Sequence, residues 1–100
     1  MIRHIVMFKL KDFGTEADKM AAAAEVKKRL DELPAAIPVI RKYEAGIDIR
    51  KLDWSYDIVL TMDFDSMADL DAYTVHPFHQ EFITFNKDYS AAKVCIDYEI

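Results

Sequence analysis

The side chains best suited to proton chemistry are the three histidines of the chain. His76 and His79 lie three positions apart, shortly after Tyr73. An imidazole titrates near neutral pH, so a histidine beside a phenol or a carboxylate in a partly closed cavity can act as a general acid or base. With His4 and Asp97, at opposite ends of the chain, these residues give four candidate catalytic side chains: His79, Tyr73, Asp97 and His4.

Each of these residues also has a purely structural interpretation. In that interpretation His76, which precedes Pro77, caps the helical turn that follows. His4 is then a hydrogen-bonded histidine at a sheet edge, and Tyr73 belongs to the core. The residue types alone leave both interpretations open.

The sequence carries no metal-binding motif. Two histidines three positions apart bind a metal only where further ligands converge on them, and there is no HxH, HExxH or CxxC pattern. Cys95 is the single cysteine, so it cannot form an internal disulfide, and we interpret it as a small strand residue. We therefore predict no metal and no other cofactor.

The composition of the chain limits the kinds of partner that it can have and its location in the cell. The chain has 13 Lys and Arg against 18 Asp and Glu, a net charge of -5, which disfavours nucleic acid and anionic membranes as partners. No apolar run approaches the length of a membrane span, and strand-like residues begin at Ile2 with no signal-peptide pattern before them. We expect a cytoplasmic protein.

In the first half of the chain, strand and helix patterns alternate. Residues 2–10 predict a strand, and Thr15 with Asp18 resembles the capping box that starts a helix. We expect Pro34 to end that helix and a second strand to cover residues 39–49. The apolar stripe of the helix is predicted to comprise Met20, Ala23, Val26, Leu30 and Leu33.

The second half repeats the alternation. Residues 56–64 predict a third strand, and Ser66 caps a second helix that is expected to break at His76, before Pro77. Residues 94–100 predict a fourth strand. The apolar positions of the broken helix are Leu70, Tyr73, Phe78, Phe82, Phe85 and Tyr89.

The order βαββαβ predicts an α+β, ferredoxin-like fold in which two helices cover one face of a four-stranded antiparallel sheet. On the bare face the first strand presents either Ile5 and Met7 or Val6 and Phe8, and both pairs are apolar. A second copy of the chain is the simplest cover for such a face, so we predict a homodimer that pairs through its sheets as a barrel. From these residues we expect the small-molecule site to lie between the two sheets, not in the core of one chain.

Two acids interrupt the mixed faces of strands. A buried, unpaired carboxylate is costly, so Asp57 and Asp97 are each expected to meet a donor or water. The candidate ligand-binding residues are His76, Asp57, Val59 and Phe82.

Nearly the whole chain resembles the stress-responsive dimeric α/β-barrel family. The most specific segment, residues 70–79, holds an aromatic-x-x-His-Pro-x-His pattern, and residues 1–11, 56–60, 64–66 and 97–98 also fit. The resemblance implies a homodimer with a cavity between each sheet and its helices. Many members of that family have no established activity.

The resemblance also implies roles for the candidate residues. One plant member closes a polyketide chain by an aldol reaction without a cofactor. By resemblance, His79 would take a proton from a carbon next to a carbonyl, with Asp97 orienting the imidazole and Tyr73 bonded to the developing oxyanion. His4 is implied as a cavity residue, and Asp57 stands where that enzyme has a further cavity histidine.

Three functions stay open from the sequence. We favour a homodimer that binds a small, partly apolar molecule. The alternatives are a cofactor-free enzyme of the cyclase, lyase or monooxygenase kind with His79 as base, and a purely structural or regulatory dimer. A side-chain-filled core beside His79 would favour the last.

Overall fold

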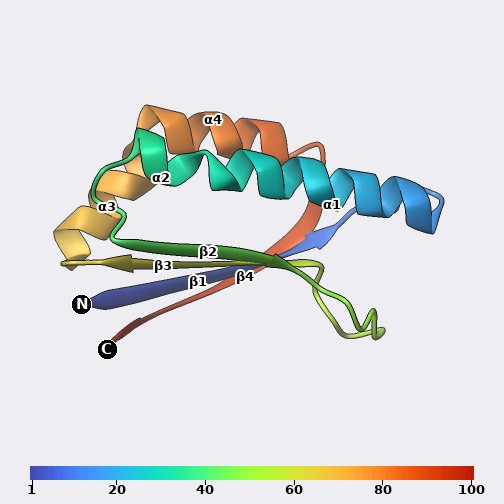
Figure 1. The fold of residues 1–100 in the computed structure, drawn as a ribbon, viewed down its shortest axis with the longest axis horizontal. Coiled ribbons are helices and arrows are strands. Elements are labelled where there is room, and N and C mark those ends of the chain that lie inside the picture. Colours follow the sequence, from blue (N-terminus) through green and yellow to red (C-terminus); the bar gives the residue numbers. More distant parts are fainter.

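The structure, a computed structural model, describes residues 1–100 and has the predicted ferredoxin-like architecture (Figure 1). One antiparallel sheet has the strand order β2-β3-β1-β4, and every helix lies on the same side of it. Each predicted helix is divided in two. The elements in chain order are β1 (Ile2–Leu10), α1 (Glu16–Asp31), α2 (Leu33–Ala36), β2 (Lys42–Ile47), β3 (Ile58–Phe64), α3 (Met67–Val75), α4 (Pro77–Asn86) and β4 (Ser90–Glu99).

The predicted helix starts are confirmed by their caps. The Thr15 hydroxyl accepts a hydrogen bond from the Asp18 amide at 3.1 Å, and the Ser66 hydroxyl accepts one from the Asp69 amide at 3.2 Å. Each bond satisfies an amide that the first helical turn leaves without a partner.

Two expectations for the first helix were wrong. The helix ends at Asp31, and Pro34 lies in the first turn of α2, where its missing N–H costs no hydrogen bond. Met20 is 57 % exposed because it lies beside the buried stripe rather than in it. The buried positions of α1 are Ala22, Ala23, Val26 and Leu30.

His76 divides α3 from α4, as predicted. Its backbone is extended, with φ −61° and ψ 135°, and its Nδ1 accepts a hydrogen bond from the Phe78 amide at 3.1 Å. His76 is therefore the N-cap of α4.

Three strands begin at other residues than predicted, and β2 also ends earlier than predicted, at Ile47. Strand β2 begins only at Lys42, because Ile40 closes a turn with the Ile37 carbonyl and packs into the core. Strand β3 begins at Ile58, although the Asp57 amide still bonds to the Phe8 carbonyl at 2.9 Å. Strand β4 begins at Ser90, where a register shift opposite Leu10 extends its pairing with β1.

Strand alternation decides which face of the sheet is bare. Val6 and Phe8 are buried under the helices, so Ile5 and Met7 point to the other side. Met7 lies opposite Val94, and Ile5 lies opposite Ile96. The apolar patch on the uncovered sheet face, called the sheet patch below, comprises Ile5, Met7, Val94, Ile96 and Tyr98.

None of the helices is both long enough and apolar enough to cross a membrane.

Candidate functional site

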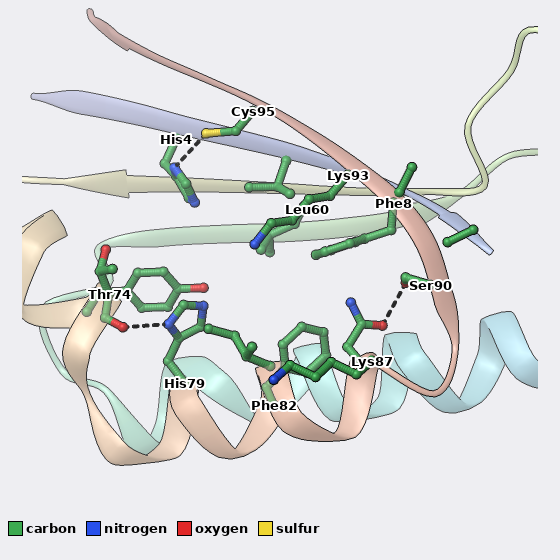
Figure 2. A pocket seen from close by; sticks show the side chains of 16 residues that line it. His4, Phe8, Leu60, Thr74, His79, Phe82, Lys87, Ser90, Lys93 and Cys95 are labelled. Atoms are coloured by element: carbon green, nitrogen blue, oxygen red, sulfur yellow. Dashed lines mark hydrogen bonds between the residues drawn. The ribbon is translucent and has the colours of Figure 1, made fainter. Parts of the chain in front are cut away.

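A pocket of about 480 Å³ lies within one chain, between strands β1 and β4 of the sheet and helix α4 (Figure 2). This is the location that the family resemblance implied, and the site expected between two sheets stays a prediction. The pocket exists because the edge strand β4 is exposed and lines it with small side chains, which leave space that larger residues would fill. These residues are Ser90, Ala91, Ala92 and Cys95.

The pocket has apolar walls, a polar end beside α3 and further polar side chains, Asn86, Lys87 and Ser90, at the C-terminal end of α4. Phe82, a candidate ligand-binding residue, lines it, and the other apolar walls are Val6, Phe8, Leu60 and Ile83. The polar end is formed by His4, Tyr73 and His79. Such a combination suits a molecule with an apolar body and a single polar group.

The charged residues that line the pocket are both lysines, Lys87 and Lys93. None of the 18 acidic residues of the chain lines it. The ion pairs of the structure involve neither lysine. The pocket is therefore locally positive in a chain whose net charge is -5.

His79 is held in one tautomer by the backbone. Its Nδ1 lies 2.9 Å from the carbonyl oxygen of Thr74, and because a carbonyl only accepts, Nδ1 carries the proton. The other ring nitrogen, Nε2, keeps its lone pair and faces the pocket interior (Figure 2). The Gln80 side chain donates to the same carbonyl at 2.7 Å.

Burial lowers the pKa of the His79 imidazole. The hydrogen bond to Thr74 opposes this shift, and nearby basic groups, first among them His4, reinforce it. Near neutral pH the imidazole is thus in its basic, neutral form.

Tyr73 packs against His79 and is buried, with 2 % exposure. The two ring centroids are 4.2 Å apart, and the Phe64 ring lies 5.3 Å away on the other side. Burial raises the pKa of the Tyr73 phenol, so the hydroxyl stays protonated and can donate to a bound oxygen atom.

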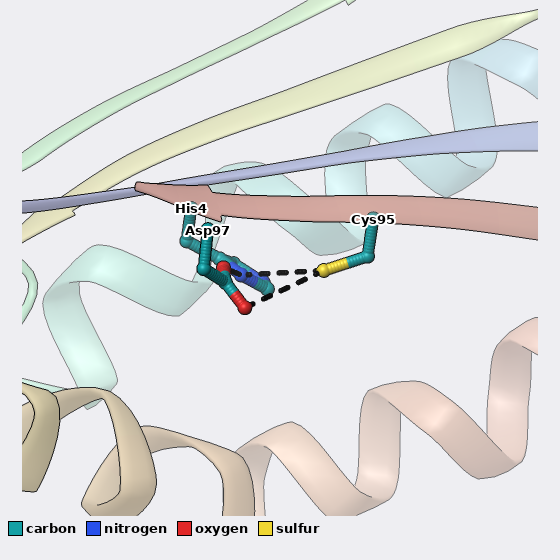
Figure 3. Close-up of side chains that lie close together, drawn as sticks. All are labelled: His4, Cys95 and Asp97. Carbon is teal, nitrogen blue, oxygen red and sulfur yellow. Dashed lines mark hydrogen bonds and ion pairs between the residues drawn. The ribbon is translucent and has the colours of Figure 1, made fainter. Parts of the chain in front are cut away.

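His4, Cys95 and Asp97 form a second group at the polar end, on the sheet (Figure 3). The Nδ1 of His4 is hydrogen-bonded to the Asp97 carboxylate, its neighbour across the β1–β4 pair. The Cys95 sulfur lies 3.8 Å from that nitrogen and 3.7 Å from Asp97 Oδ2. Burial and the adjacent carboxylate raise the pKa of the Cys95 thiol.

The structure changes the implied role of Asp97. The carboxylate is bonded to His4, and the group that orients His79 is the carbonyl of Thr74. Asp97 itself does not line the pocket.

Three predicted ligand-binding residues lie outside the pocket. His76 uses its Nδ1 to cap α4. Asp57 has the donors expected for it, since it accepts a hydrogen bond from the Leu10 amide at 2.7 Å and pairs with Lys19 at 3.1 Å. Val59 lies opposite Met7, on the uncovered face of the sheet.

Sequence reasoning missed Thr74, Lys87, Lys93 and Cys95 as pocket residues. For Lys87 a signal was available: His79, Ile83 and Lys87 recur every four residues and so share one face of α4 and its C-cap. Thr74, Lys93 and Cys95 line the pocket only because of the way that α3 and α4 pack over β4, and no sequence pattern marks that packing.

Comparison with known proteins agrees with this fold. An uncharacterised protein of Streptomyces coelicolor is 31 % identical over 100 residues, in an alignment that covers 99 % of each chain. A dimeric protein of unknown function with a ferredoxin-like fold from Bacteroides fragilis is 32 % identical, with a TM-score of 0.86 over 99 % of this chain and 95 % of that one. A dimeric ferredoxin-like protein of unknown function from Thermobifida fusca is 29 % identical, with a TM-score of 0.83 over 99 % and 90 % of the two chains.

The match to a family covers almost the full length. Residues 2–100 match the stress responsive A/B barrel domain. The chain therefore belongs to the stress-responsive A/B barrel domain family.

Proposed function

We propose that the chain forms a homodimer that binds a small, partly apolar anion, such as a carboxylate, in the pocket between β4 and α4. The observation that carries this proposal is the pairing of apolar walls with two lysines that form no ion pair. The apolar body of the ligand would lie along Phe8 and Phe82, and removal of this surface from water supplies the driving force.

The charge of the lining selects the polar group of the ligand. Lys87 and Lys93 attract an anion, and the Tyr73 hydroxyl offers a hydrogen bond to its oxygen. Because the rest of the chain is acidic, this local positive charge distinguishes the pocket from other surfaces.

The sheet patch is the proposed dimer interface. Its exposed apolar side chains include Ile96 at 58 % and Val94 at 48 % exposure, and a second copy would remove them from water. The dimeric relatives from Bacteroides fragilis and Thermobifida fusca support a homodimer.

Binding can be tested with octanoate, whose controls are octylamine and octanol, ligands of similar shape and different charge. In NMR titrations we expect octanoate to shift the signals of Phe82, Ile83 and Cys95, with smaller effects from octanol. Equal binding of octylamine, or no shift at these residues, would contradict the proposal.

A second candidate function is proton abstraction by His79 without a cofactor, which the fixed tautomer favours. The Nε2 lone pair would accept a proton from a carbon next to a carbonyl, and Tyr73 would donate a hydrogen bond to the enolate oxygen that forms. Aldol-type cyclisations begin in this way. Deuterium exchange into the α-carbon of a β-keto thioester in D₂O, faster than the spontaneous rate with the wild type and returned to that rate in His79→Ala, would support this function.

A purely structural or regulatory dimer would need no open space beside His79. The pocket beside His79 therefore argues against this third function.

A further inference from the structure

The cluster of His4, Cys95 and Asp97 joins three different metal-binding groups on the pocket side of the sheet (Figure 3). One imidazole nitrogen, one thiol sulfur and one carboxylate oxygen lie within 4.8 Å of one another. His4 lies 91 positions before Cys95 and 93 before Asp97, so no single sequence motif marks the cluster.

The β1–β4 ladder fixes the positions of all three residues. His4 lies directly opposite Asp97, and Cys95, two positions earlier in β4, points to the same face. The backbone that carries the side chains is hydrogen-bonded strand, so little order has to be created when an ion binds.

The two distances from the Cys95 sulfur suit a tetrahedral ion, whereas the His4–Asp97 contact must widen for an ion to bind. Metal–ligand bonds of about 2.0 to 2.3 Å place neighbouring ligand atoms of Zn²⁺ about 3.3 to 3.6 Å apart. The Cys95 sulfur lies 3.8 Å from His4 Nδ1 and 3.7 Å from Asp97 Oδ2. His4 and Asp97 share a proton in their hydrogen bond, and an ion would replace that proton as the Asp97 side chain rotates away from the ring.

We propose that His4, Cys95 and Asp97 bind a divalent transition-metal ion, with Zn²⁺ as the representative case. Three protein ligands leave the fourth position open. His4 and Cys95 both line the pocket, so that position faces the pocket and is available to water or to an oxygen atom of a bound molecule. Metal binding at this cluster does not depend on the proposed ligand-binding function.

The ligand set selects the class of ion. Thiolate and imidazole favour Zn²⁺, Co²⁺ and Ni²⁺, whereas Mg²⁺ and Ca²⁺ prefer oxygen ligands. An excess of MgCl₂ should therefore not displace the ion.

Titration with CoCl₂ tests the site, because cobalt bound to a thiolate shows a sulfur-to-metal charge-transfer band in the near ultraviolet. We expect one Co²⁺ per chain with this band, and displacement of the ion by Zn²⁺. Cys95→Ser should abolish the band, and Asp97→Asn and His4→Ala should each weaken Zn²⁺ binding about tenfold or more.

Lys28→Ala is the control, because Lys28 is an exposed lysine on α1 that neither lines the pocket nor offers a ligand to the cluster. It should bind cobalt like the wild type, as should His79→Ala, which removes the other histidine of the pocket. Circular dichroism establishes that each variant is folded. A folded wild type without the band would overturn the proposal, as would unchanged affinity in both His4→Ala and Asp97→Asn or loss of binding in His79→Ala alone.

Discussion

The Nδ1 atom of His79 lies 2.9 Å from the carbonyl oxygen of Thr74, five residues earlier in the chain. The contact spans the break between α3 and α4, so the helix break itself orients the imidazole. The same bond leaves Nε2 as the basic atom in the pocket.

The first prediction concerns the protonation of His79. Burial depresses its pKa in the folded chain below the ordinary value of 6.5, so below that pH the unfolded chain binds more protons. The contribution of His79 to stability is therefore complete above pH 6.5 and is lost as the pH falls toward the folded pKa. Urea unfolding from pH 7.5 to about 5 should show a smaller loss of stability in His79→Gln than in the wild type.

An NMR titration of the imidazole carbon signals measures the same quantity directly. A His79 pKa above 6.5 in the folded chain would contradict the prediction.

The second prediction concerns the lysines of the pocket. Lys87→Ala and Lys93→Ala should each weaken octanoate binding by about 0.5 to 1 kcal/mol, or about two- to fivefold, because both amines are solvent-exposed. Added salt should reduce the difference from the wild type. Lys28→Ala, an exposed lysine on α1 away from the pocket, is the control for net charge. Equal effects of all three substitutions in calorimetric titrations would show that only net charge matters.

The third prediction concerns the sheet patch. If the proposed homodimer pairs through the sheet patch, Ile96→Asp should be a monomer, because an unpaired carboxylate in a dry interface costs at least about 2 kcal/mol. Ile49→Asp is the matched control, since Ile49 is 89 % exposed and lies outside the strands. Light scattering coupled to size-exclusion chromatography gives the mass of each variant. A dimeric Ile96→Asp would place the interface elsewhere.

The fourth prediction separates the cap from the pocket. His76→Ala should lower the free energy of unfolding by about 1 kcal/mol, because the Phe78 amide loses its acceptor. His76→Asn supplies another capping oxygen and should restore most of that loss. Octanoate affinity should be the same in both variants. A large loss of affinity with unchanged stability would instead assign His76 to the binding site.

The sequence was sufficient to predict the order of the elements because period-two and helical patterns, with caps at Thr15 and Ser66, are local signals. It could not settle which face of β1 is covered, since Ile5 and Met7 are as apolar as Val6 and Phe8. Only packing against the helices decides that question.

The candidate site, too, could be predicted only in part from the sequence. The block around His79 is contiguous in sequence and could be identified, but strand register brings His4 to Cys95 and Asp97. The spacing of these residues along the chain carries no information about that contact. The pocket in turn depends on small residues in β4 that have no local pattern.

The last prediction uses Tyr73 to distinguish packing from binding. Tyr73→Ala removes a buried ring that contacts Phe64 and His79 and should cost about 3 kcal/mol or more of stability. Tyr73→Phe keeps the ring and removes only the hydroxyl of this pocket residue. Its stability should stay within about 1 kcal/mol of the wild type. If the hydroxyl donates to a bound carboxylate, Tyr73→Phe should weaken octanoate binding about tenfold, since a hydrogen bond to a charged group contributes about 1.5 kcal/mol or more. Unfolding and binding measured on the same two variants separate these roles, and an unchanged octanoate affinity in Tyr73→Phe would leave Tyr73 a packing residue alone.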